Sequence, residues 1–109
     1  MAKMPYLTML FGRLRIEDYL KRKGFEVKNE SKLLDGIIKL HFERDGLDRL
    51  VEGEVIIRDM IVNGEPLYKG ELRVEVSNGR KYVYVYRNYK SNKFYNVEGR
   101  LIKKLSEVM

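Results

Sequence analysis

The chain has 109 residues and a formal net charge of +6, and its 44% hydrophobic and 35% charged residues are typical of one folded domain. It contains no cysteine and one histidine, which excludes disulfide bonds, thiol catalysis and cysteine-ligated zinc. No apolar run has the length of a membrane-spanning helix. We therefore expect a basic cytoplasmic protein, one domain over residues 1–109, that binds no cofactor, metal or membrane. Abundant lysine and glutamate, without glutamine, indicate a hyperthermophile source.

An N-terminal helix is predicted to begin near Thr8 and to end before Gly24. The acids Glu17 and Asp18 come early in this segment and three bases come late, an order that suits the helix dipole. Gly24 stands where helices commonly stop, just beyond the last turn. An extended segment follows from Phe25.

From Gly36 onward, apolar and polar residues alternate with the period of half-buried strands. Three pairs of turn-forming residues separate these strands: Asp45-Gly46, Asn63-Gly64 and Asn78-Gly79. The predicted strands cover residues 36–43, 48–62, 67–76 and 80–88, and the segment after Gly24 offers a fifth.

A C-terminal helix is predicted over residues 96–109. Its apolar residues recur every three or four positions and share one face: Val97, Leu101, Leu105 and Val108. The fold class is therefore α+β, an antiparallel meander of four to five strands with an N-terminal and a C-terminal helix.

The Asn78-Gly79 turn predicts the register of the last hairpin. A two-residue loop pairs Ser77 with Arg80, and this register places Val83 and Val85 on the core face. The three tyrosines of the strand then point outward, opposite charged residues of the preceding strand: Glu71, Arg73 and Glu75. A shift of one residue would exchange the two faces, so the register decides which side chains are free to bind a partner.

Residues 78–96 carry five basic residues, six aromatic residues and no acid. A clustered positive charge indicates a polyanionic partner. Cations would hold phosphates, and each base stacked on a ring would contribute roughly 1–3 kcal/mol. The acid-free loop after the strand supports this better than the tyrosines, which face glutamates. The predicted nucleic-acid-binding residues are Arg80, Lys81, Tyr82, Tyr84, Tyr86, Arg87, Tyr89, Lys90 and Lys93.

The same residues also fit a protein-interaction module, because tyrosine and arginine are enriched at protein interfaces. Such a module would form a homodimer, or would be a regulator or inhibitor that binds an acidic partner. Catalysis has less support, since His41 has no cysteine partner and no adjacent serine with which to build a triad. The glycines form no phosphate-binding loop. We assign no catalytic residue and no metal ligand.

The first third of the chain resembles the opening of restriction-endonuclease-like nucleases, in which a helical glutamate precedes a Gly-Phe strand and an aspartate. Glu17, Gly24-Phe25 and Asp35 match this pattern, which implies metal-assisted hydrolysis. The chain departs from it further on, since residues 52–54 and 71–73 lack the lysine of the acid-x-lysine strand. The leading hypothesis is thus a small non-catalytic DNA- or RNA-binding protein. An interaction module is second and a metal-dependent nuclease third.

Overall fold

The computed structural model describes residues 14–44, 50–76, 79–88 and 94–108. The described elements are α2 (Arg15–Arg22), β1 (Glu26–Asn29), the 3-10 turn η1 (Leu33–Asp35), β2 (Ile37–Glu43), β3 (Leu50–Val62), β4 (Glu65–Val76), β5 (Lys81–Asn88) and α3 (Phe94–Val108). The predicted α+β class is confirmed: an antiparallel sheet lies between an N-terminal and a C-terminal helix in the chain.

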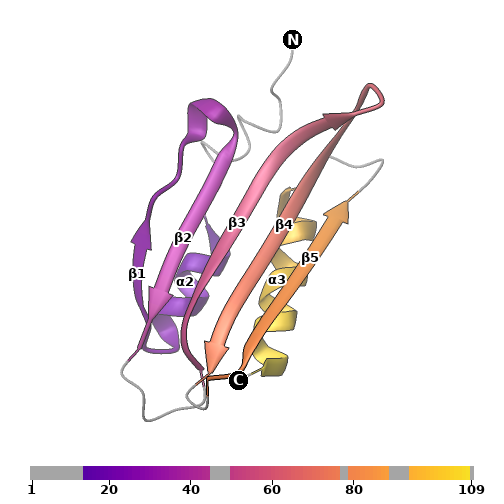
Figure 1. Ribbon diagram of the computed structural model, residues 1–109. Helices are drawn as coiled ribbons and strands as arrows, with labels where there is room; N and C mark the ends of the chain where they lie inside the picture. The colour runs from indigo at the N-terminus through magenta and orange to yellow at the C-terminus, as the bar shows by residue number, and fades with distance from the viewer. Residues whose placement is uncertain (1–13, 45–49, 77–78, 89–93, 109) are drawn as a thin grey trace.

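The sheet is a meander in which the spatial order of the strands is their order in the chain, β1 to β5, and each strand is antiparallel to its neighbour. Both helices pack on one face, α2 behind the first strands and α3 behind β4 and β5 (Figure 1). No described helix or strand covers the opposite face, which we call the open face.

The core lies between the sheet and the two helices. Alternate residues of each strand point into it, as Leu40 and Phe42 do from β2, and Phe42 packs edge-to-face on Phe25 with ring centroids 5.3 Å apart. The predicted face of the C-terminal helix is buried here, with Val97, Leu101 and Leu105 fully covered. This inward alternation decides which strand residues remain for function on the open face.

Gly70 lets α3 approach the sheet closely. A Cβ atom at this position would lie 2.6 Å from Val97 Cγ1 and 3.0 Å from Leu101 Cδ1, closer than carbon atoms pack. The glycine in the middle of β4 is therefore a packing requirement, and it fixes the distance between the helix and the strands.

The ends of α2 test the helix prediction. The predicted stop is confirmed, because Gly24 has a φ of +91° just beyond the last turn. The predicted start near Thr8 is wrong for this helix, since Leu14 is extended and α2 begins at Arg15; residues 8–13 lie outside the described residues. An apolar stripe shows helical periodicity but does not fix where a helix begins.

Of the three predicted turns, one is fully described and one is described in part. The Asn63-Gly64 turn is confirmed, with φ values of 53° and 80° between β3 and β4, as a two-residue hairpin loop requires. The Asp45-Gly46 turn lies outside the described residues. The third turn, before β5, differs from the prediction and changes the candidate site.

Candidate nucleic-acid interface

The register of the β4–β5 hairpin differs by one residue from the prediction. The N–H of Val76 donates to the carbonyl of Arg80 over 3.0 Å, and Glu75 stands opposite Lys81, whereas the predicted register pairs Glu75 with Tyr82. The physical reason is the loop: three residues separate Val76 from Arg80, and the third, Gly79, has a φ of +84°. A three-residue loop that ends in a left-handed glycine is the next commonest hairpin connection after the two-residue loop.

This shift exchanges the two faces of β5, so the predicted assignment of its side chains is wrong. Val83 and Val85 lie on the open face with exposed fractions of 64% and 39%. The tyrosines stand opposite the inward-facing residues of β4, as Tyr84 does opposite Leu72. Tyr84 and Tyr86 are half-buried and pack against the core, while Tyr82 remains 38% exposed.

Two tyrosine rings carry cations of α3. Lys104 Nζ lies 4.8 Å from the ring centroid of Tyr84, and Arg100 Cζ lies 4.9 Å from that of Tyr86. Such cation–π contacts contribute about 0.5–1 kcal/mol at exposed sites and hold the cation in place. Tyr84 and Tyr86 therefore position two helical cations beside β5, whereas Tyr82 is the exposed one of the three β5 tyrosines.

A row of three cations crosses the open face at the level where β2 begins and β5 ends. Arg58 of β3 stands opposite Lys69 of β4, and Lys69 stands opposite Arg87 of β5. We call these three residues the basic row. Arg58 and Arg87 are exposed, and the side chain of Lys69 is 24% exposed. Arg87 thus belongs to a larger basic surface than β5 alone provides.

The basic row is electrostatically unfavourable in the isolated protein. Like charges that face each other across neighbouring strands destabilise a sheet by up to about 1 kcal/mol per pair. Glu71 offsets part of this repulsion, because its carboxylate lies 3.9 Å from Lys69 Nζ and 3.6 Å from Arg73 Nη2. Arg58 and Arg87 flank Lys69 on either side, so a bound anion would relieve the remaining repulsion.

The other end of the open face is acidic. Glu43 stands opposite Glu52, and Glu52 stands opposite Glu75 on β4. Glu75 lies six positions after Lys69 on β4, which corresponds to about 20 Å along the strand. The open face is therefore polarised along its strands, and a polyanion would be attracted to one end and repelled from the other.

Apart from the three tyrosines of β5, the predicted site residues fall into three groups. Arg87 lies in the basic row, while Arg80 and Lys81 are exposed at the acidic end of β5. Tyr89, Lys90 and Lys93 lie outside the described residues, between β5 and α3. Contact with nucleic acid stays a prediction for these three residues, and also for the predicted binding residues that the structure describes.

Four cations of the candidate surface were missed from the sequence. Arg58 and Lys69 join Arg87 only through the sheet register, because successive members of the row are 11 and 18 positions apart in the chain. Arg100 and Lys104 reach β5 only because α3 packs behind it. The spacing of these helical cations, four residues apart, indicates a shared helix face, but nothing in the sequence shows which strand that face meets.

The residues of the nuclease pattern do not come together as a metal site. Glu17 pairs with Lys21 one turn along α2, with 3.1 Å between its Oε2 and the lysine Nζ. Asp35 is exposed in η1. Within the described residues, the group of three metal-ligating side chains is His41, Glu43 and Glu52, which includes neither.

Comparison with protein families, with curated proteins and with solved structures finds no match to this chain. Neither α2 nor α3, the two described α-helices, combines the length and apolarity needed to cross a membrane. The function must therefore be inferred from the charge and geometry of the two ends of the sheet.

Proposed function

We propose that the protein binds nucleic acid without catalysing a reaction, through the basic row and the adjoining edge formed by β5 and α3. The observation that supports this most is the basic row itself. Three cations stand in direct register across three strands, an arrangement that weakens the sheet unless an anion neutralises it. A phosphate backbone presents the repeated negative charge that such a row attracts.

Phosphate contacts would supply most of the affinity. Arg58 and Arg87 approach the backbone from the open face, and Arg100 does so from the helix side of Tyr86. Contacts of this kind fix position but carry no sequence information, so we expect binding with little sequence preference. The exposed ring of Tyr82 would add stacking only with a single-stranded or distorted target.

The acidic end limits the footprint. Lys81 stands opposite Glu75, so its positive charge faces a carboxylate on the neighbouring strand. A nucleic acid that follows the basic row avoids the glutamates about 20 Å away. Arg80 and Lys81 are therefore expected to contribute less than Arg58 and Arg87.

Three double variants with equal charge loss test the location of the interface. Arg58→Gln/Arg87→Gln removes two members of the basic row, and Arg80→Gln/Lys81→Gln removes two cations at the other end of β5. Arg22→Gln/Lys32→Gln is the matched control, since both residues are exposed and lie outside the proposed surface. Fluorescence anisotropy with labelled single-stranded and duplex DNA and RNA at 50 mM salt gives the dissociation constants.

The basic-row variant is expected to bind about 100-fold more weakly or worse, because each of the two charge-assisted contacts contributes about 1.5–3 kcal/mol and 1.4 kcal/mol is tenfold. The control variant is expected to bind as the wild type does. If all three variants bound equally more weakly than the wild type, affinity would depend only on net charge, and the proposed position of the interface would be contradicted. Absence of binding by the wild type would contradict the function.

One observation favours the protein-interaction alternative. β5 is an edge strand, and its exposed Val83 and Val85 form an apolar pair on the open face. A homodimer through antiparallel β5 strands centred on Tyr84 would put Lys81 of one copy opposite Arg87 of the other, which repels. An acidic protein partner fits better, and light scattering after size-exclusion chromatography, with and without nucleic acid, distinguishes these cases.

A further inference from the structure

Four glutamates form a continuous row at the acidic end of the open face. The register places Glu26 opposite Glu43, Glu43 opposite Glu52, and Glu52 opposite Glu75, on β1 to β4. Within the described part of the chain, Glu26, Glu43 and Glu75 make no ion pair with a basic side chain. Like charges in direct register destabilise a sheet, and Lys81 of β5 offsets this only at one end of the row, opposite Glu75. A cation bound at the centre of the row would therefore stabilise the sheet.

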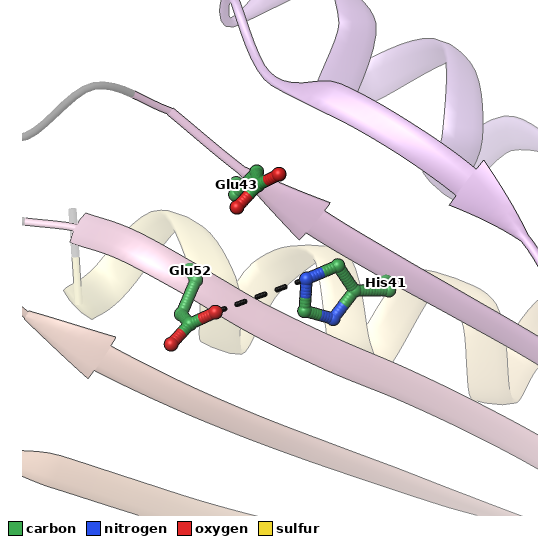
Figure 2. Close-up of side chains that lie close together, drawn as sticks. All are labelled: His41, Glu43 and Glu52. Atoms are coloured by element: carbon green, nitrogen blue, oxygen red, sulfur yellow. Dashed lines mark ion pairs between the residues drawn. The ribbon is translucent and has the colours of Figure 1, made fainter.

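His41 adds a different kind of ligand to the centre of this row. It lies two residues before Glu43 on β2, on the same face, and its Nε2 is 3.8 Å from Glu52 Oε2. One ligand atom each from His41, Glu43 and Glu52 all lie within 4.8 Å of one another, and the imidazole and Glu52 carboxylate point toward each other from adjacent strands (Figure 2).

From this geometry we infer that His41, Glu43 and Glu52 bind one divalent transition-metal cation. Bonds of 2.0–2.2 Å to a tetrahedral ion would put the donor atoms about 3.4 Å apart. The three side chains are partly or fully exposed, so small rotations close the gap without disturbing the core. His41 and Glu52 also line a hollow of ≈ 350 Å³ on the open face, through which an ion reaches them from solvent.

The ligand types select the class of ion. Mg²⁺ and Ca²⁺ prefer sites made entirely of oxygen, whereas an imidazole favours Zn²⁺, Ni²⁺, Co²⁺ or Cu²⁺. One imidazole and two carboxylates that can reach a common point match Zn²⁺ best. Zinc binds both nitrogen and oxygen donors, and in sites with three protein ligands a water molecule takes the fourth coordination position. This inference is independent of nucleic-acid binding, which involves the other end of the sheet.

Isothermal titration of the untagged protein with Zn²⁺, and separately with Mg²⁺, tests the site. The test variants are His41→Asn and Glu52→Gln. Glu71→Gln is the matched control, because it removes the same charge from the same face but lies outside the cluster. Circular dichroism confirms that each variant is folded.

We expect one Zn²⁺ per chain, no comparable binding of Mg²⁺, and an affinity that falls about 10- to 100-fold or more in both test variants but not in the control. Absence of Zn²⁺ binding by the wild type overturns the inference. Unchanged binding by His41→Asn also overturns it, since the ion would then be adventitious on surface carboxylates only.

A second measurement reports directly on the imidazole. The chain has a single histidine, so every imidazole resonance in an NMR spectrum belongs to His41. Its ring signals are expected to shift on addition of Zn²⁺ and to stop shifting at one equivalent. Zinc binding that leaves these signals in place contradicts the proposed ligand set, even if Glu52→Gln proves unstable.

Discussion

Glu98 joins the two helices through a buried carboxylate. It is fully covered, and its Oε2 accepts a hydrogen bond from the Ile16 N–H over 3.1 Å while Oε1 accepts one from Arg15 Nε over 3.0 Å. The residue before α2, Leu14, offers no side-chain cap. Glu98 therefore satisfies the first turn of α2 from α3 and places negative charge at the positive end of the helix dipole.

Substitution of Glu98 by alanine is expected to lower the free energy of unfolding by about 1–3 kcal/mol. The change leaves the buried N–H of Ile16 without an acceptor, and an unsatisfied buried group costs about this much. Glu107→Ala in the same helix is the control, because its ion pair with Lys104 is exposed and such pairs contribute about 0–1 kcal/mol. Urea unfolding measures both; equal losses would contradict the capping role.

The same carboxylate predicts a pH dependence of stability. Burial raises the pKa of Glu98, an effect that the hydrogen bonds from Ile16 and Arg15 only partly oppose. The folded chain thus holds this proton more tightly than the unfolded chain. Stability from this group is present below the ordinary glutamate pKa and is lost as pH rises through the raised folded value.

Glu98→Gln is expected to remove that contribution, so the difference in unfolding free energy between wild type and variant should change with pH just above the ordinary glutamate range. Urea unfolding at a series of pH values from about 4 to 7 measures this difference. A difference that stays constant across the series would contradict the raised pKa.

At the scale of secondary structure, the packing of α3 on β4 depends on one missing side chain. Gly70→Ala is expected to destabilise the fold by about 1–3 kcal/mol, because the added methyl group would overlap Val97 and Leu101. Gly99→Ala is the matched control within α3. Its Cβ would meet only Arg15 Nη2 at 3.6 Å, so it should stabilise the helix by about 0.5–1 kcal/mol.

Thermal and urea unfolding of the two glycine variants show directly whether each substitution raises or lowers the free energy of unfolding. Opposite signs support the close approach of α3 to the sheet at Gly70. Destabilisation of similar size at both positions would contradict it, since both substitutions add the same methyl group.

The elements were predictable from the sequence, but the pairing between them was not. Strand periodicity and the glycine stop of α2 depend on the conformational preferences of residues that are close together in the sequence. The β4–β5 register depended on one loop residue: a left-handed Gly79 makes the loop three residues long and moves Val83 and Val85 to the open face. Asn-Gly favours the two-residue loop, but three-residue loops that end in a left-handed glycine are also common in hairpins, so local sequence did not decide between them.

The candidate sites show the same limit of local information. Arg87 was predicted because its neighbours in the chain are basic, whereas Arg58 and Lys69 join it only across strands. His41 and Glu43 share a face by simple alternation, yet Glu52 meets them only through the β2–β3 register. Both clusters are therefore properties of the folded sheet.

At the scale of the whole molecule, charge is separated along the sheet, and this predicts a conflict between stability and binding. Arg58→Gln/Arg87→Gln removes the repulsion on both sides of Lys69, so the free energy of unfolding should rise by about 0.2–1 kcal/mol. The same variant should bind nucleic acid more weakly. Urea unfolding of this variant and of Arg22→Gln/Lys32→Gln measures the effect, and a clear loss of stability would contradict the repulsive row.

The salt dependence of nucleic-acid affinity tests the proposed interface most directly. Neutralisation of about five phosphates predicts a slope of log affinity against log salt near −4.5 for duplex and −3.5 for single strands. In Arg58→Gln/Arg87→Gln the slope should become shallower by about 1.8 for duplex and about 1.4 for single strands. Arg22→Gln/Lys32→Gln should keep the wild-type slope. A wild-type slope near zero, or a basic-row variant whose slope equals that of the wild type, would contradict the proposal.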